Sequence, residues 1–383
     1  NLKIIYGALY NLDDINKGSG TFFHICKELK NQGHDVIQIQ PQHHDFPFLT
    51  KFFRYISKKI LRKKYFSYMD PFIAHRLCKK IESNLSDKSF DLFLTNDYSI
   101  VSYLKIKKPI VLWTDSVFPC DYKNNKHPWL NDLSLFSVRF CQFIVSKALK
   151  NVSFCIVPGA WNKEEILEYN VIGEEKISII PFGANISDPQ LKKSLNKKEL
   201  KKKIRILFIG KDFNTKGLEI AISVVKLLKL KNVDAILNVV GENPADDAEK
   251  NESIQYYGFL DKSNNADLEL LHSLFIRSDI FLMPSIAEGF GIVYMEAAAH
   301  GIPSLGYKTT GVTGSVINNY SGKLLPINAT ASAFVEEILY WRDNPSYYNN
   351  LCLQSRQHYE INGNWRVLIS RFIDLIKNKF VLK

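Results

Sequence analysis

The sequence predicts an α/β protein made of two doubly wound domains, in each of which helices cover both faces of a parallel sheet. Short apolar runs alternate with segments of helical period, and this alternation stops once, at a polar lysine-rich stretch, and then starts again. The 383 residues are enough for two domains of ordinary size. We place two Rossmann-like domains at 1–186 and 204–352, followed by a tail at 353–383.

The first half begins with a strand expected at 2–9, a loop that ends in Gly18-Ser19-Gly20, and a helix expected at 21–32. Gly33 suits the position after this helix, because glycine readily adopts the left-handed conformation that ends many helices. Further short apolar runs follow at 36–39, 92–94, 110–113, 154–157 and 177–180. Continuously apolar strands are typical of a parallel sheet that is buried on both faces.

Residues 188–203 interrupt the pattern with a proline and seven lysines, and we interpret them as a solvated linker rather than a binding site. The alternation then resumes, with strands expected at 204–209, 235–240 and 280–283 and helices at 218–230 and 292–300. Sheets of this kind bind ligands at the carboxyl ends of their strands. The loops that follow the strands are therefore the places where a site is expected.

Composition narrows the functional classes. The six cysteines form no Cys-x-x-Cys pair and no zinc-finger spacing, so we expect reduced thiols in a cytoplasmic protein. No apolar run is long enough for a membrane span, and the chain opens directly into a strand-like run, which predicts a protein that is soluble or peripheral to a membrane. The formal charge of +11 favours an anionic partner. Without a zinc-finger or RNP-type pattern, we do not expect nucleic acid to be that partner.

The most informative stretch is 285–296, which runs from a strand end through a glycine-rich loop into a helix. Free amides and the helix dipole at such a helix start favour an anion, and Gly289 and Gly291 leave room for a ligand against the backbone. Gly291 and Glu296 lie roughly 7–8 Å apart along a helix axis, about the span of a diphosphate. Glu288 and Glu296 would then bind sugar and ribose hydroxyls on either side. A capped helix with two solvent-facing glutamates remains an equal alternative.

A second stretch, 208–217, places Lys211 and Lys216 after a strand end and a glycine. At the carboxyl edge of a sheet, two lysines can neutralise a diphosphate, and especially its leaving group. Surface lysines in an ordinary loop are the alternative interpretation of this stretch alone.

Together these stretches resemble glycosyltransferase family 4, the retaining nucleotide-sugar transferases of the GT-B fold, in which two Rossmann-like domains face each other across a cleft. The resemblance covers most of residues 204–326 and consists of five segments in order: Gly210-Lys211 with Lys216-Gly217, Glu288 with Glu296, the run 296–303, Thr310-Gly311-Val312-Thr313-Gly314, and 320–326. In the first domain, Gly18-Ser19-Gly20 and Pro181-Phe182-Gly183-Ala184-Asn185 resemble its glycine-rich loop and its closing motif more distantly.

The resemblance implies a role for each matching residue. Lys211 and Lys216 hold the donor diphosphate, and Glu288 accepts hydrogen bonds from the sugar. Glu296 binds the ribose. The remaining donor-binding positions are backbone sites: Gly289, Phe290, Gly291 and Ile292 around sugar and phosphate, Phe259 and Leu260 facing the base, and Gly18 and Gly20 near the phosphates. In this family, a helix such as the one expected at 365–379 crosses back onto the first domain.

Two departures from the family stand out. Lys211 occupies a position that is often arginine, and lysine keeps the charge without the bidentate fork. Many members carry a His-Asp pair in the first domain, where this chain has Trp113-Thr114-Asp115, so only Asp115 is kept. We include Asp115 among the candidate catalytic residues, because it can face either the donor sugar or the acceptor.

No metal or other cofactor is expected. The chain has no Asp-x-Asp motif, and two lysines and a helix start already supply positive field for a diphosphate. The acidic pairs Asp13-Asp14 and Asp246-Asp247 are interpreted as loop residues, and so is His43-His44-Asp45 between prolines.

The segment 51–64 holds seven basic residues and no acidic one, interleaved with aromatic and aliphatic residues. Phe52, Ile56 and Ile60 recur every four residues, as on one face of a helix. A basic amphipathic helix can lie on an anionic membrane surface. The alternative is a helix that packs on its own domain and turns a basic face to solvent.

The expected reaction transfers a glycosyl group from a UDP- or GDP-sugar to a hydroxyl of a glycan, lipid-linked or small-molecule acceptor, with retention, in cell-surface glycan or glycolipid synthesis. Two other classes stay open: a nucleotide-sugar epimerase on the same fold, and a non-enzymatic basic protein that binds membrane or nucleic acid. The residues do not distinguish the base, the sugar or the acceptor, and they nominate no catalytic nucleophile.

Overall fold

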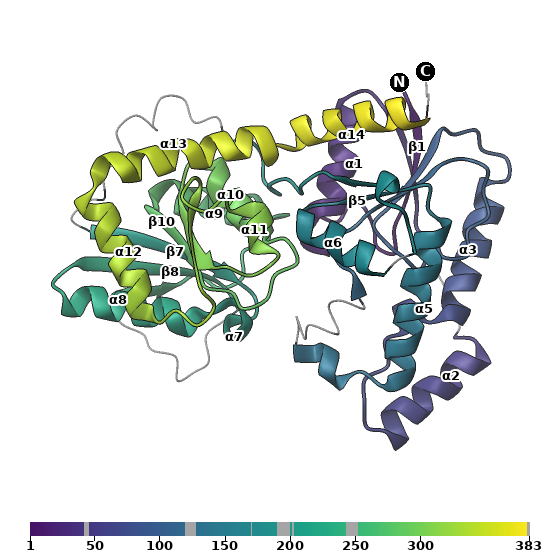
Figure 1. Cartoon of the computed structure of the whole chain (residues 1–383), viewed down its shortest axis with the longest axis horizontal. Helices are drawn as coiled ribbons and strands as arrows, with labels where there is room; N and C mark the ends of the chain where they lie inside the picture. The colour runs from purple at the N-terminus through teal and green to yellow at the C-terminus, as the bar shows by residue number, and fades with distance from the viewer. Residues whose placement is uncertain are drawn as a thin grey trace. The chain divides into compact units, whose positions relative to one another are not determined.

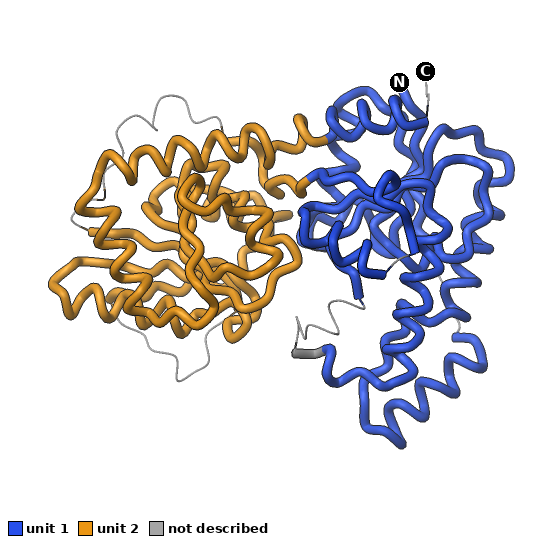
Figure 2. Tube along the Cα trace, in the orientation of Figure 1, with its two compact units in different colours: residues 1–180, 369–383 blue, residues 181–368 orange. Residues whose placement is uncertain are grey.

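The computed structural model describes residues 1–41, 46–118, 128–169, 171–189, 200, 203–242 and 252–380 (Figure 1). The chain divides into two compact units, which are described separately (Figure 2). Unit 1 is formed by Asn1–Ile180 with Ile369–Lys383, and unit 2 by Pro181–Leu368. Each unit contains one six-stranded parallel sheet, so the predicted fold class is confirmed.

The sheet of unit 1 has the strand order β2-β1-β3-β4-β5-β6. Its strands are β1 (Lys3–Gly7), β2 (Asp35–Ile39), β3 (Leu92–Thr95), β4 (Ile110–Trp113), β5 (Phe154–Val157) and β6 (Ile177–Ile179). Strands β3, β4 and β5 are buried along their whole length, as their continuous apolar sequences predict. In the register of the sheet, Ile5 of β1 lies between Ile37 and Phe93.

Helices cover this sheet and fill the connections between its strands. They are η1 (Lys17–Gly20), α1 (Thr21–Asn31), α2 (Phe48–Tyr55), η2 (Ile56–Ile60), η3 (Ser67–Met69), α3 (Pro71–Leu85), η4 (Pro128–Asp132), α5 (Leu135–Asn151), α6 (Ala160–Glu168) and η5 (Glu174–Lys176). Side-chain hydrogen bonds to backbone amides explain where two of these helices, α3 and α5, begin. The carboxylate of Asp70 accepts hydrogen bonds from the amides of Phe72 and Ile73, and Ser134 caps α5 in the same way.

The basic segment differs from its prediction. The helix begins at Phe48, becomes a π-helix at Ile56 and ends at Ile60, so it does not continue to Lys64. Arg62 has a positive φ of 50°, which right-handed helix excludes. The backbone of Lys64 instead pairs beside α5, where its carbonyl accepts a hydrogen bond from the amide of Ser134 at 2.9 Å.

The sheet of unit 2 has the strand order β12-β11-β10-β7-β8-β9. Its strands are β7 (Lys203–Gly210), β8 (Asp234–Gly241), β9 (Ile254–Tyr256), β10 (Ile280–Met283), β11 (Ser304–Tyr307) and β12 (Gly322–Leu325). Its helices are α7 (Phe213–Lys216), α8 (Leu218–Leu230), α9 (Asn265–Arg277), α10 (Ile292–Ala299), α11 (Val312–Ser315), α12 (Ala331–Asp343) and α13 (Pro345–Asn362). The core between sheet and helices includes Phe208, Phe275 and Trp341.

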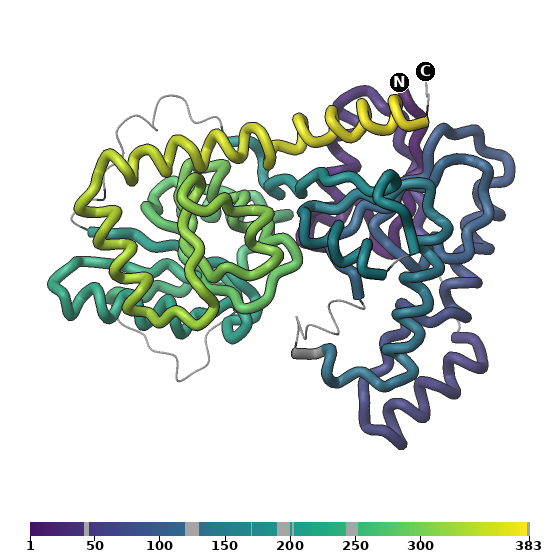
Figure 3. Tube along the Cα trace, viewed as in Figure 1, coloured from purple at the N-terminus to yellow at the C-terminus, as the bar shows by residue number. Residues whose placement is uncertain are grey.

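The end of the chain belongs to both units. Helix α14 (Trp365–Phe380) starts in unit 2, and its residues from Ile369 onward count with unit 1. There the ring of Phe372 stacks on Trp113 at 5.4 Å, and Ser370 donates a hydrogen bond to Gln32. The C-terminal helix and the N-terminal elements therefore lie side by side within unit 1 (Figure 3).

The segment 181–185 packs in unit 2 against the start of α14. The amide of Ala184 donates to the carbonyl of Gly363 at 2.8 Å, and the indole of Trp365 donates to Asn185 at 2.9 Å. A side chain at Gly183 would lie 2.7 Å from this indole, which explains why the position needs glycine. The predicted arrangement of two domains across a cleft stays a prediction.

Most of the predicted linker at 188–203 lies outside the described residues. Among the helices in the described ranges, none combines the length and the hydropathy that crossing a bilayer requires. Five cysteines are described, and all five are buried free thiols; Cys120 lies outside the described residues.

Candidate functional site

The two predicted phosphate-binding stretches meet at the carboxyl edge of the unit 2 sheet. The amide of Ile286 donates to the carbonyl of Thr215 at 3.0 Å, and the hydroxyl of Ser285 donates to the same carbonyl at 3.2 Å. Gly217, with φ of 80°, fits closely against the end of β10, because an added Cβ would lie 2.3 Å from the carbonyl oxygen of Pro284. The loop after β7 is thus fixed directly to the loop after β10.

Lys216 and Glu288 form an ion pair in this edge. The ammonium of Lys216 lies 2.6 Å from Glu288 Oε1, and the side chain of Glu288 is only 9% exposed. Sequence reasoning assigned these two residues to neighbouring parts of one ligand, and the structure places them in contact. One alternative interpretation of this stretch expected a glutamate that faces solvent. Glu288 does not face solvent.

The loop 289–291 leads into α10 through a tightly packed turn. Gly291 is the residue before α10 and has φ of 78°, a conformation that strongly favours glycine. The ring of Phe290 is buried and contacts Phe182 at 5.9 Å, so this side chain belongs to the core and only its backbone is a candidate binding group. A Cβ on Gly311 would lie 2.2 Å from the carbonyl oxygen of Glu288, so this motif glycine supports the same loop.

Glu296 projects from α10 and is also paired. Its Oε1 lies 2.5 Å from the ammonium of Lys262, and the glutamate side chain is 4% exposed. Lys262 also donates to the carbonyl of Asn185 at 3.2 Å. Sequence reasoning missed Lys262, because only the backbone of the preceding Phe259 and Leu260 was assigned a role. The positive charge of Lys262, in a loop at the sheet edge, was the one feature of the sequence that could have indicated it as a site residue.

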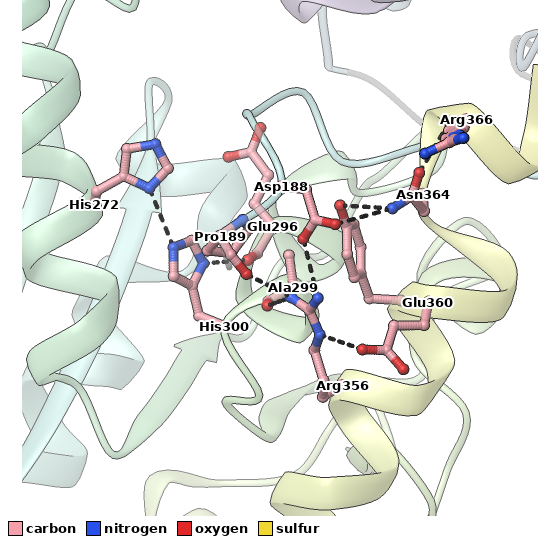
Figure 4. A network of polar contacts seen from close by, with 11 residues as sticks. Asp188, Pro189, His272, Glu296, Ala299, His300, Arg356, Glu360, Asn364 and Arg366 are labelled. Atoms are coloured by element: carbon pink, nitrogen blue, oxygen red, sulfur yellow. Dashed lines mark hydrogen bonds and ion pairs between the residues drawn. The ribbon is translucent and has the colours of Figure 1, made fainter. Parts of the chain in front are cut away.

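A network of polar contacts holds the other end of α10 (Figure 4). Arg356 of α13 donates to the carbonyl of Ala299 at 2.5 Å and pairs with Asp188 at 3.0 Å. The ring of His300 contacts the carbonyl of Glu296 at 2.8 Å and the ring of His272 at 3.2 Å. These contacts fix the backbone from which the Glu296 carboxylate projects.

Lys211 lies on the same edge but is more exposed. Its ammonium stands 4.6 Å from the centroid of the Phe259 ring, which is 50% exposed, while Leu260 is buried. A cation over an aromatic face is attracted to the ring electrons. The structure therefore brings together a predicted phosphate ligand and the segment predicted to face the base.

Of the residues predicted for the first domain, Gly18, Gly20 and Asp115 lie in unit 1, whereas the closing motif 181–185 lies in unit 2. Gly18, Ser19 and Gly20 have φ of 54°, 56° and 88°, so three successive residues are left-handed. Such a conformation in a serine costs free energy and is concentrated at functional loops. Asp115 follows β4 and is half-buried, and its backbone carbonyl accepts a hydrogen bond from Asn162 at 3.0 Å.

Asp97, which sequence reasoning also missed, lies after β3 at the carboxyl edge of the unit 1 sheet. Its carboxylate accepts a hydrogen bond from the amide of Leu9 at 2.9 Å. Burial raises the pKa of Asp97 to about 6. Neighbouring Asn96 bridges β1 and β4 through Tyr6 and the carbonyl of Trp113. This edge is thus polar and close to the strand end that carries Asp115.

The described residues contain no group of three or more His, Cys, Asp or Glu side chains that could hold a metal ion. Asp13 is a loop residue, as expected, and its carboxylate accepts a hydrogen bond from Gln38 at 2.9 Å. His43-His44-Asp45 and Asp246-Asp247 lie outside the described residues.

Comparison with known proteins supports a glycosyltransferase of the group 1 type. Residues 190–358 match the family model of glycosyl transferases group 1. The capsular polysaccharide biosynthesis glycosyltransferase CapM of Staphylococcus aureus is 27% identical over 174 residues, which cover 42% of this chain and 44% of CapM. The chain spans about half the length of the curated relatives it matches.

Solved structures show the GT-B fold. The sucrose-phosphate synthase of Thermosynechococcus elongatus aligns with a TM-score of 0.69 at 15% identity, over 100% of both chains. HepE of Anabaena, in complex with UDP and glucose, aligns with a TM-score of 0.64 at 13% identity, over 98% of this chain and 100% of HepE.

Proposed function

We propose that this chain is a family 4 glycosyltransferase that transfers a sugar from a UDP- or GDP-sugar to an acceptor hydroxyl, with retention of anomeric configuration. Glycan or glycolipid synthesis at the cell surface is the role that fits its similarity to CapM. The structure of HepE with UDP and glucose favours UDP over GDP as the first donor to test.

One observation carries the proposal. Two ion pairs, Lys216–Glu288 and Lys262–Glu296, stand at the carboxyl edge of one sheet, and their glutamates flank the first turn of α10. A nucleotide sugar needs cations or amides for its diphosphate and carboxylates for its hydroxyl groups. This edge offers both kinds of group, and they follow one another in the order in which a nucleotide sugar would need them.

In the proposed complex, the donor exchanges its own groups for the existing ion-pair partners. Lys211 and Lys216 bind the diphosphate together with the amides of 289–292, and Glu288 accepts hydrogen bonds from the sugar. Glu296 accepts them from the ribose, while the backbone at 259–260 faces the base. Because each charged side chain keeps a charged or polar partner throughout, binding leaves none of them buried alone.

Catalysis then rests on positioning and on stabilising charge as the diphosphate departs. The ammonium of Lys216 and the amides at the start of α10 meet the leaving phosphate, and no divalent metal is required for this task. In unit 1, Gly18 and Gly20 are proposed to approach the phosphates, and Asp115 to contact the acceptor or the donor sugar. The leaving phosphate itself is the proposed proton acceptor for the acceptor hydroxyl.

The test is a calorimetric titration with UDP, GDP and their sugar conjugates, followed by transfer to a panel of acceptors. We expect binding of one nucleotide class, nucleotide release that depends on acceptor, and a product whose NMR coupling shows the donor's anomeric configuration. Release of a free epimerised sugar without acceptor would identify an epimerase instead. Absence of affinity for every nucleotide would leave only a basic binding protein.

A further inference from the structure

Helix α2 and its continuation η2 carry an aromatic face that is turned away from unit 1. Phe48, Phe52 and Tyr55 recur at helical spacing and are 80%, 49% and 61% exposed. Ile60, at the end of η2, is 64% exposed. The sequence assigned Phe52, Ile56 and Ile60 to one face; Phe52 and Ile60 are exposed, whereas Ile56 is half-buried.

A different face anchors the helix to unit 1. Thr50 and Ser57 are buried, and the ring of Phe53 contacts Phe136 at 4.9 Å and Phe140 at 5.3 Å. Figure 1 shows α2 at one end of unit 1, beside the ends of α3 and α5. Phe53, Thr50 and Ser57 therefore anchor the helix, while Phe48, Phe52, Tyr55 and Ile60 stay exposed.

The same surface is strongly basic. Residues 46–69 contain seven lysines and arginines and no acidic residue. Three of the seven have internal contacts: Lys64 pairs with Asp132, Lys63 donates to the carbonyl of Asn131, and Arg54 lies over Phe46. The other four form no ion pair with any residue that the structure describes; they are the exposed Lys51, Lys58, Lys59 and Arg62.

We propose that this face, defined by Phe48, Phe52, Tyr55 and Ile60 together with Lys51, Lys58, Lys59 and Arg62, binds the surface of an anionic lipid bilayer. Aromatic side chains at helical spacing enter the boundary between headgroups and acyl chains, and lysines beside them meet anionic headgroups. Charge complementarity and the absence of acidic residues within 46–69 favour lipid over an apolar protein partner. This inference concerns unit 1 and goes beyond the proposed donor chemistry.

The chemistry predicts two components of binding. Each basic residue near an anionic surface raises the partition coefficient onto the vesicles about fivefold at low salt. Neutralising three should therefore lower this coefficient by about 100-fold. This component falls when salt shortens the screening length. The aromatic component does not depend on salt, and it should remain when the charge component is screened.

Flotation with vesicles separates these components. The full chain is mixed, without nucleotide, with vesicles of phosphatidylcholine alone or of phosphatidylcholine with phosphatidylglycerol, at low and high salt. Variant Lys51→Gln/Lys58→Gln/Lys59→Gln tests the charges, and Phe48→Ser/Phe52→Ser/Tyr55→Ser tests the aromatic face. The matched controls are Lys105→Gln/Lys107→Gln/Lys108→Gln on the same unit and Leu230→Ser/Ile276→Ser on unit 2, all exposed residues.

We expect the parent and both controls to float strongly with anionic vesicles at low salt and only weakly, through the aromatic component alone, with neutral ones. The charge variant should lose about 100-fold in partitioning at low salt, and the aromatic variant should lose the salt-resistant fraction. A folded parent that stays with the soluble fraction overturns the proposal, and so do controls that lose as much as the variants. A parent dimer that the aromatic variant converts to monomer also overturns it, because the face is then a subunit interface. Each outcome leaves the donor chemistry untouched, since nucleotide titration is measured separately.

Discussion

The pair Lys262–Glu296 provides the sharpest test of the proposed donor site. Replacement of Glu296 with alanine removes the carboxylate proposed to accept hydrogen bonds from the ribose. Hydrogen bonds to charged groups contribute about 1.5–3 kcal/mol, so nucleotide affinity should fall by roughly 10- to 160-fold. Calorimetric titration with UDP and with GDP measures this loss.

The same change has a separate effect on folding. Glu296 Oε1 lies 2.5 Å from the ammonium of Lys262, and the alanine variant leaves that ammonium without its carboxylate. Lys262 keeps its bond to the Asn185 carbonyl, and its side chain is 19% exposed. We therefore expect the free energy of unfolding to fall by about 1–2 kcal/mol, below the cost of breaking a fully buried pair. Urea denaturation checks this value.

Two further variants distinguish binding from structural disturbance. Lys262→Met keeps the carboxylate and removes the cation that competes with the ribose, so nucleotide affinity should be kept or rise although the fold is weakened. Glu219→Ala removes an exposed charge from α8 and should change neither quantity. Unchanged nucleotide affinity in a folded Glu296→Ala protein would refute the ribose role. Equal losses in Glu296→Ala and Lys262→Met would show that the ion pair, and not the carboxylate, matters.

Three other predictions address the sugar subsite, the metal and the pH response. Glu288→Gln should leave affinity for free UDP or GDP nearly unchanged and strongly reduce turnover; an equal loss of affinity for nucleotide and nucleotide sugar would contradict the sugar role. Transfer activity should survive EDTA, because Lys211, Lys216 and the amides of 289–292 supply the positive field; a complete loss that added metal restores would reveal a metal site. Burial lowers the pKa of His358 from 6.5 to about 4, so the folded state binds its proton less readily than the unfolded state. Stability from this group is full above pH 6.5 and is lost as pH falls toward 4, which costs on the order of 1 kcal/mol by pH 5.5. Urea denaturation at pH 7.5 and 5.5 should show a smaller loss in His358→Asn than in the parent, and equal losses in both would exclude His358 as a contributor.

The sequence predicts the fold well because its signals are local. Uninterrupted apolar runs such as 110–113 and 154–157 are short and lie between helical segments, and they form the buried parallel strands β4 and β5. The glycine before α10 is also a local signal, because the turn requires a left-handed backbone at position 291 and glycine adopts that conformation readily.

Other features depend on residues far apart in the chain and could not be predicted. Lys262 reaches Glu296 across 34 positions, and no periodicity links them. The inward face of α2 is another case, because the half-buried Phe53 packs against Phe136 and Phe140 from a later helix. Two apolar faces were available on that helix, and only the neighbours decide which one packs.

The division of the chain into units has a consequence for biosynthesis. Unit 2 is one continuous stretch, whereas unit 1 needs residues 369–380, which are translated only after the whole of unit 2. Until they arrive, the large apolar surface of Trp113 lacks the ring of Phe372 that stacks on it. The first unit to be translated is thus the last to be completed, and a nascent chain that stalls before position 369 lacks the ring that covers Trp113, which favours aggregation and chaperone binding.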